Sequence, residues 1–397
     1  MIGAGVFAAF TPAAQAAGNG LLIGLAVAAI VAACNALASA QLAAAYPTSG
    51  GTYIYGREQL GPWWGFLAGW SFVIGKTASC AAMALTFASY AAPAGWERPV
   101  AVVAVVGLAA VNYRGVTRTA QLTRVIVVLV LVGLTVAVAS AGASRLPALS
   151  SLDADSLIAS GPYGLLQSAG LLFFAFAGYA RVATMGEEVR DPARTIPRAI
   201  IVALTITVLV YVVVAVALLG TLGADGLADS GAPVRDAALA SGATWVGPVV
   251  TVGAALASLG ALLGLIAGVG RTSLAMAREA DLPRWLAAVH PRFHVPHRAE
   301  VVVAAIVGVL VLTVDLRGAI GFSSFGVLLY YFVANISALS QGRNRFPRGV
   351  FVVGALGCVT LVVTLPVGAV IGGVVVLAVG VLYRVIRLRT SSQSSGS

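Results

Sequence analysis

The strongest constraint on this chain is a series of long apolar segments that runs through nearly the whole sequence. An α-helix needs about 20 such residues to cross the hydrocarbon core of a bilayer. Only 10% of the residues are charged and 59% are hydrophobic, whereas about one quarter of the residues of a soluble domain are charged. The sequence therefore predicts an all-α polytopic membrane protein.

Twelve apolar segments are predicted. The first, at residues 4–17, is short and lacks the half-helix that should precede it, which suggests a mis-set start at Met1 or a truncated chain. The other segments are 21–45, 63–92, 100–111, 121–141, 162–186, 200–222, 245–277, 301–314, 320–339, 350–365 and 367–386.

Two of these segments contain interruptions. The stretch from Leu171 to Pro197 begins as an apolar helix and thins to small residues around Gly178, and the chain opens with a second break at residues 3–5. Backbone at membrane depth tolerates an interruption only beside protein or a polar cavity. Freed carbonyls there can hold an ammonium, and a half-helix N-terminus can face an anion. The two breaks therefore predict a substrate site between them.

The spacing of the breaks predicts an inverted repeat. They lie in the first and sixth segments, and because five is odd, the second group of five runs through the membrane in the opposite direction. This arrangement is typical of the LeuT-type 5+5 inverted repeat, here followed by two C-terminal helices. The predicted units are a first repeat at 1–143, a second repeat at 160–341, the last two segments at 347–389 and a disordered cytoplasmic tail at 390–397.

The basic residues indicate the orientation. If the first segment starts in the cytoplasm, most arginines fall in cytoplasmic loops, as the positive-inside rule requires. The net charge of +10 is then explained without a nucleic-acid partner. The arginines left outside are Arg98, Arg145, Arg235 and Arg317.

Four motifs give a resemblance to a known family. They read IGAGVF at 2–7, YPTSGGTYIYGREQLGP at 46–62 with GFLAGW at 65–70, FFAFAGYARVATMGEEVRDPARTIPRAI at 173–200, and RTSLAMAREADLPRWLAAVHPRFHVP at 271–296. In this order the chain resembles the amino acid–polyamine–organocation (APC) superfamily of transporters. The resemblance implies a transporter that binds an amino-acid backbone between the two breaks.

The resemblance also implies roles for particular residues. The substrate carboxylate would bind N–H groups of Gly3, Ala4 and Gly5. The amino group would bind carbonyls of Phe174, Ala175 and Ala177. An aromatic gate would be Phe176 or Tyr179. N–H groups complement a carboxylate and carbonyls complement an ammonium, so the physical interpretation agrees.

The chain departs from many relatives near this site. They have an acidic residue just after the glycine-aromatic pair of segment six, where this chain has Ala180 and Arg181. Several proton-coupled or exchanging relatives carry a lysine in segment five, and residues 124–134 contain none.

Lys76, the one lysine of the sequence, lies in segment three, roughly 18 Å from its cytoplasmic end. A charge near mid-membrane costs about 3 kcal/mol or more on insertion scales, so such groups usually have a function. Lys76 could couple protons to transport by losing its proton, or pair with an anionic substrate side chain. The alternative is a structural lysine bonded to backbone carbonyls at a helix break. We prefer coupling because the lysine of segment five is missing.

Other polar residues have two interpretations each. Glu187 and Glu188 could form an inner gate with Arg271 or Arg278, or lie on a solvated face with weak surface pairs. Tyr330, Tyr331 and Asn335 could line the cavity or a helix interface. The histidines at 290, 294 and 297 lie beside prolines and have no carboxylate or thiol to complete a metal site, so no metal is predicted.

The sequence predicts a secondary transporter of amino acids or related amines in the bacterial cytoplasmic membrane, working by alternating access. Coupling would be to protons or to a counter-substrate. No nucleotide motif or catalytic arrangement is present, so neither an enzyme nor a cofactor is predicted. The alternatives are a polyamine or cationic amino acid antiporter, disfavoured because no acidic residue lies deep in a span, and a non-transporting sensor or scaffold.

The orientation gives a first testable prediction. Reporter fusions after Arg145 and after Arg389 should report opposite sides of the membrane, with the C-terminus in the cytoplasm. Activities of a periplasmic and a cytoplasmic reporter measure this. Both fusions on the same side would contradict the orientation and the inverted repeat together.

Overall fold

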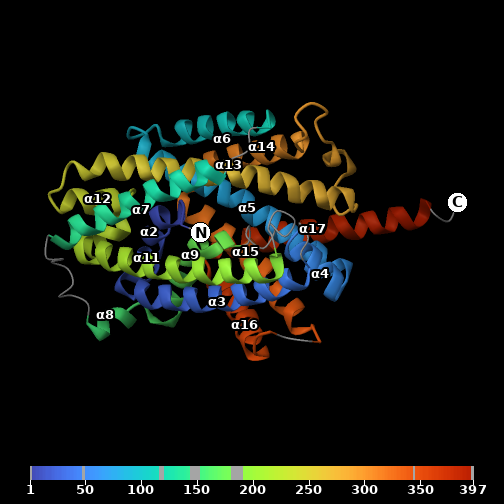
Figure 1. Ribbon diagram of the computed structural model, residues 1–397, viewed down its shortest axis with the longest axis horizontal. Coiled ribbons are helices and arrows are strands. Elements are labelled where there is room, and N and C mark those ends of the chain that lie inside the picture. The colour runs from blue at the N-terminus through green and yellow to red at the C-terminus, as the bar shows by residue number, and fades with distance from the viewer. Residues whose placement is uncertain are drawn as a thin grey trace.

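The computed structural model describes residues 2–46, 50–115, 120–143, 153–179, 191–342 and 345–394. Every regular element in these ranges is helical, and most of the long helices run side by side along the long axis of the molecule (Figure 1). Seven helical stretches within the described ranges are long and apolar enough to cross a membrane.

The helices follow the predicted order. The first half comprises α1 (Gly5–Ala8), α2 (Phe10–Ala17), η1 (Gly18–Gly20), α3 (Leu21–Ala45), α4 (Thr52–Leu60), α5 (Pro62–Ala91), α6 (Glu97–Tyr113) and α7 (Ala120–Ala143). The second half comprises α8 (Ala154–Ile158), α9 (Gly161–Phe176), η3 (Ala177–Tyr179), α11 (Pro192–Asp229), α12 (Pro233–Ala240), α13 (Val246–Arg278), η4 (Arg284–Ala287), α14 (His297–Thr313) and α15 (Leu316–Leu339). The last two helices are α16 (Arg348–Thr364) and α17 (Val367–Ser394).

Most predicted boundaries agree with the helices to within a few residues. Two differ more. Helix α11 begins at Pro192, because a proline fits the first turn of a helix, where its missing N–H has no acceptor to lose. Helix α17 continues to Ser394, so its backbone takes up part of the predicted tail at 390–397.

The helices pack in two groups. Helices α2, α3, α9 and α11 contact one another, and α5, α6, α13 and α14 form the second group. Helix α15 contacts both α3 and α5. Figure 1 shows the short helix α12 at one end of the bundle and α4 at the other, which we call the α12 end and the α4 end. Helix α1 contacts members of both groups, α2 and α9 in the first and α5 in the second, whereas α9 contacts its own group and α15.

Small residues let α5 and α15 approach closely, as in many membrane helix pairs. A Cβ on Gly326 would lie 2.6 Å from the carbonyl oxygen of Ser71, and one on Gly75 would lie 3.0 Å from that of Ser323. The hydroxyls of Ser79 and Ser323 are 2.6 Å apart. Helix α5 is therefore held firmly where it carries Lys76.

Tyr330 and Asn335 lie in helix interfaces, as one of their two interpretations predicts, and Tyr331 packs edge-on against Phe173 of α9. The Asn335 amide donates to Asn35 Oδ1 of α3 at 2.6 Å, and the Tyr330 hydroxyl accepts the Thr52 N–H at 3.1 Å. Both side chains are buried. Interhelical hydrogen bonds of this kind stabilise membrane helix packing.

His290 stabilises the turn before α14. The His290 Nδ1 accepts the backbone N–H groups of Arg292 and Phe293 at 3.2 and 3.3 Å. Its ring and that of His297 both pack edge-on against Tyr113 of α6. These contacts join the loop before α14 to the end of α6.

A buried ion cluster at the α4 end joins three elements. Asp281, just after α13, accepts the Tyr53 hydroxyl of α4 at 2.8 Å and pairs with Arg57 and with Arg384 of α17. The Arg384 guanidinium also lies 4.9 Å above the Trp63 ring. Burial and the Asp281 charge raise the pKa of Tyr53. Because Asp281 and Arg384 are both 6% exposed, the cluster anchors α17 to the first repeat.

Replacing Asp281 with asparagine should destabilise the protein, because Arg384 would keep a buried charge without its carboxylate. Losing one partner of a buried pair costs about 3 kcal/mol or more. Unfolding in detergent by added SDS measures the change. Asp191→Asn is the matched control, since its pair with Arg194 is exposed and 3.9 Å apart and should contribute about 0–1 kcal/mol. Equal losses in both variants would contradict the role of the cluster.

Candidate substrate-binding site

The two predicted interruptions meet inside the bundle. Helix α1 begins at Gly5, and α9 ends at Phe176. A Cβ on Gly5 would lie 2.6 Å from the Ala175 Cα and 2.8 Å from its Cβ. Real Cβ atoms do not approach backbone this closely, so only glycine allows α1 and α9 to touch here. The structure thus brings together Gly5 and Ala175 from the two predicted halves of the site.

The first interruption is a short one. Ala4 accepts the Phe7 N–H at 3.0 Å, and Gly3 precedes it without regular structure. Ala9 keeps helical angles (φ −82°, ψ −20°) between α1 and α2. The chain therefore runs as nearly continuous helix from Gly5, and the irregular backbone is confined to the residues before it.

The three carbonyls predicted to hold an amino group all have internal donors. The Phe174 carbonyl accepts the Ala177 N–H, which closes the last turn of α9. The Ala175 carbonyl accepts the Tyr211 hydroxyl at 2.9 Å. The Ala177 carbonyl accepts the Lys76 ammonium at 3.1 Å. A carbonyl has two lone pairs, but in this conformation each carbonyl is already engaged.

Lys76 is the one charged side chain among these donors. It is 6% exposed and, within the described part of the chain, forms no ion pair with a carboxylate. Its hydrogen bond to the carbonyl at a helix break is also what the structural interpretation of this lysine predicts. The structure therefore places Lys76 at the site and leaves its role to the functional argument.

The predicted gates are only partly described. Phe176 is fully buried, and its ring centroid lies 5.1 Å from that of Tyr211, which also contacts Phe10. Tyr179 is described by its backbone only, at the end of η3, and Glu187 and Glu188 lie outside the described residues. Phe176 therefore joins α9 to α11 in this conformation.

Contacts around Tyr90 close the site towards the α12 end. The Tyr90 hydroxyl of α5 donates to the Phe7 carbonyl of α1 at 3.2 Å and accepts the Val234 N–H of α12 at 3.3 Å. Arg235 lies over the same ring, 5.7 Å from its centroid. One buried tyrosine thus joins the first interrupted helix to α12.

Arg317 of α15 makes a second contact at this end. Its guanidinium donates to Gln15 Oε1 of α2 at 3.4 Å and to Gln167 Oε1 of α9 at 3.0 Å. Gln15 in turn donates to the Ala228 carbonyl at 2.8 Å. Both interrupted helices are therefore tied to α15, and α2 is also tied to the end of α11.

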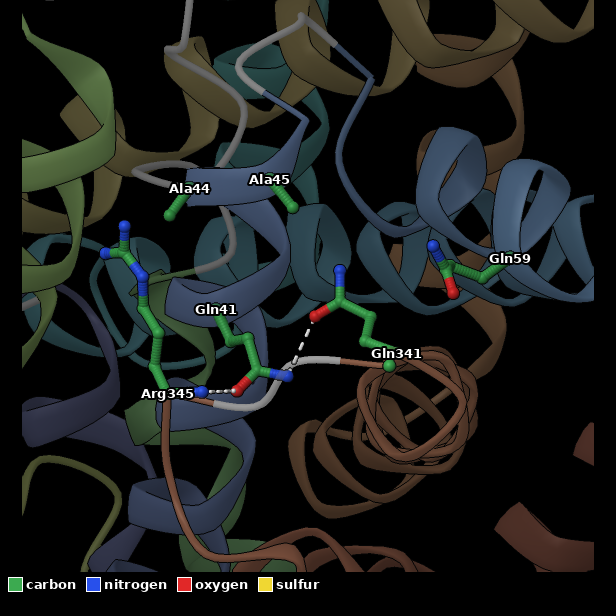
Figure 2. A pocket seen from close by; sticks show the side chains of 7 residues that line it. Gln41, Ala44, Ala45, Gln59, Gln341 and Arg345 are labelled. Atoms are coloured by element: carbon green, nitrogen blue, oxygen red, sulfur yellow. Dashed lines mark hydrogen bonds between the residues drawn. The ribbon is translucent and has the colours of Figure 1, made fainter.

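A polar pocket of about 410 Å³ lies at the α4 end (Figure 2). The Gln41 amide of α3 donates to Gln341 at 2.8 Å and accepts the Arg345 N–H at 2.9 Å. None of its lining residues is a predicted site residue. They are Gln41, Ala44, Ala45, Gln59, Gln341, Gly342 and Arg345. The pocket is therefore separate from the two breaks.

Sequence reasoning missed Tyr211, Tyr90 and Arg317. A signal existed for the tyrosines, because a hydroxyl within an apolar segment must find a partner when it is buried. Nothing in the sequence indicated which carbonyl would accept it. Arg317 was predicted to lie outside the membrane between the segments 301–314 and 320–339, but it lies in the first turn of α15, within a candidate span. Its partners are glutamines rather than the carboxylates that charge patterning would detect.

The two interrupted helices, the two packed groups and the two added helices define a LeuT-type transporter fold. The crystal structure of MhsT in complex with L-phenylalanine is similar, with a TM-score of 0.63 and 14% sequence identity. The match covers 91% of this chain and 95% of that one. The predicted fold class is confirmed.

The chain belongs to the amino acid permease family, whose model matches residues 1–388. An uncharacterized transporter of Mycobacterium tuberculosis is 58% identical over all of this chain and 91% of its own length. The branched-chain amino acid permease BcaP of Bacillus subtilis is 26% identical, over 88% of this chain and 79% of that permease. Cationic amino acid transporter 7, chloroplastic, of Arabidopsis thaliana is 28% identical, over 84% and 62%. The resemblance to the APC superfamily is confirmed, and the protein is a multi-pass membrane transporter.

Adding a side chain at Gly5 should separate α1 from α9. We expect Gly5→Ala to lower stability by about 1–3 kcal/mol, as overpacking does, and Gly5→Val to abolish substrate binding. The control is Gly107→Ala in α6, where a Cβ meets nothing within 4 Å and where alanine should be neutral or stabilising by up to about 1 kcal/mol. SDS-induced unfolding and binding of labelled amino acids measure both effects. Normal affinity in Gly5→Val would mean that the substrate binds elsewhere.

Proposed function

We propose that this protein is a secondary active transporter that moves amino acids across the bacterial cytoplasmic membrane by alternating access. The observation that carries the proposal is the contact of the two interrupted helices at Gly5 and Ala175, with Lys76 bonded to the carbonyl just past α9. Backbone that leaves its helix at membrane depth is tolerated where it lines a site.

The chemistry of the two breaks suits an amino-acid backbone. Gly3, Ala4 and Gly5 bear no side chain beyond a methyl group, so a carboxylate can reach their N–H groups. Carbonyls at 174, 175 and 177 offer acceptors for an ammonium. The names of relatives support the same substrate class, since one is a branched-chain and another a cationic amino acid transporter.

The conformation suits one half of an alternating-access cycle. The α12 end is closed by the Tyr90 and Arg317 contacts, which involve both interrupted helices. The hydrogen bonds of Arg317 go to neutral amides. Among the residues that the structure describes, opening this end therefore separates no ion pair of Arg317. Its contacts can break and re-form within one transport cycle.

Lys76 favours neutral or anionic substrates over cationic ones. A cationic side chain would be repelled strongly as it approaches the charged Lys76 of the substrate-free protein, because the interaction is poorly screened there. The alternative of a polyamine or cationic amino acid antiporter is therefore weaker than transport of amino acids without a cationic side chain. A non-transporting sensor or scaffold would bind an amino acid without moving it.

Uptake into proteoliposomes tests the proposal. We expect labelled L-leucine or L-glutamate to accumulate under a pH gradient or to exchange with the same amino acid inside, and labelled L-arginine to accumulate far less. Liposomes without protein give the background. Binding to the purified protein without uptake or exchange would favour a sensor, and arginine as the best substrate would favour the cationic antiporter.

A further inference from the structure

At the second interruption, the three carbonyls predicted to accept an amino group already have hydrogen-bond donors. These donors differ in kind. A backbone N–H donates to the Phe174 carbonyl, and a tyrosine hydroxyl donates to the Ala175 carbonyl. A primary ammonium donates to the Ala177 carbonyl. The Lys76 side chain thus makes, from within the protein, the same N–H···O contact that an amino acid's ammonium would make.

We propose that Lys76 is an internal competitor for the amino-group subsite, displaced with release of a proton when an amino acid binds. This rests on the proposed function and deepens it. The substrate ammonium forms a hydrogen bond to the Ala177 carbonyl, and the bond from Lys76 Nζ breaks. The Lys76 ammonium gives its proton to water entering with the substrate and becomes a neutral amine. One positive charge then replaces another at the carbonyl.

The surroundings of Lys76 favour release over retention of the proton. On α5 itself the titratable group that interacts with Lys76 is the Cys80 thiol, and the titratable side chains of α15 are Arg317, Tyr330 and Tyr331. From α11 comes Tyr211, bonded to Ala175. None of these groups is negatively charged at neutral pH, so none compensates a second cation.

The carboxylates of the other helices packed on α5 lie at the ends of the bundle. Glu300 is in the first turn of α14, beside Gly270 of α13. Glu97 is in the first turn of α6, and Glu58 is exposed on α4. Glu279 and Asp281, after α13, pair with Arg57, and Arg384 of α17 pairs with Asp281. With substrate bound, the described residues therefore leave a charged Lys76 without a counter-charge.

Proton release gives the binding reaction a definite pH dependence. If binding releases one proton, the affinity for a zwitterionic amino acid rises about tenfold per pH unit while free Lys76 is charged. The direction follows because higher pH removes a product of the reaction. A substrate gradient could then drive proton movement across the membrane, or a proton gradient could drive release of the substrate from the site.

Calorimetric titration of the purified protein with L-leucine measures the released protons. The binding enthalpy is compared in phosphate and Tris buffers, whose heats of protonation differ. We expect release of about one proton per leucine at pH 7. For Lys76→Met we expect no proton release and an affinity at least tenfold higher, because the competitor is gone. For Lys76→Arg, which keeps its charge, we expect no proton release and an affinity at least tenfold lower.

The two variants share the site and differ in charge, so they control for each other, and SDS-induced unfolding checks that both are folded. Leucine binding without proton release, or weaker leucine binding by Lys76→Met, overturns the displacement. If the wild type binds only L-glutamate and Lys76→Met does not bind it, Lys76 pairs with the substrate's side chain and the displacement is overturned. If leucine, glutamate and arginine all fail to bind the wild type and the variants, the proposed function fails first. If the variants bind leucine but the wild type releases no proton on binding, the displacement is wrong and the proposed function still stands.

Discussion

The structure depends on satisfying backbone groups where α9 stops inside the bundle. Water is scarce at that depth, so each carbonyl released by the end of the helix needs a donor from the protein or from a ligand. Tyr211 and Lys76 come from two different helices to provide donors. The close approach of Gly5 to Ala175 keeps the first interruption beside the same carbonyls. Packing, burial and the proposed exchange of partners all follow from this one requirement.

Much of the fold could be predicted because the relevant signals are local. Apolar length located α3 and α5 to within a residue or two, and the small residues before Gly5 and around Ala177 located both interruptions. The parity of the intervening segments predicted the inverted repeat. These signals come from the bilayer, which imposes a length and a backbone constraint on each segment separately.

The partners across the fold could not be predicted in the same way. That Lys76 lies near mid-membrane follows from counting residues, but that it reaches Ala177 depends on how α5 and α9 pack. Asp281 follows the predicted segment 245–277 with no signal of a partner, and its burial between Tyr53 and Arg384 depends on α17 returning to the α4 end. Single-sequence patterns carry no information on pairs this far apart. The roles proposed for the site residues are accordingly the part that needs experiment.

The anchored position of α17 has a practical consequence for spectroscopy. Arg384 and Arg387 bind it to Asp281 and to the Leu282 carbonyl, next to the end of α13. A spin label or fluorophore near these anchors would move with the α5 and α13 group. Paired with a second probe on α2 or α9, it provides a stationary reference point, and distance changes between the two would report the motion of the interrupted helices alone.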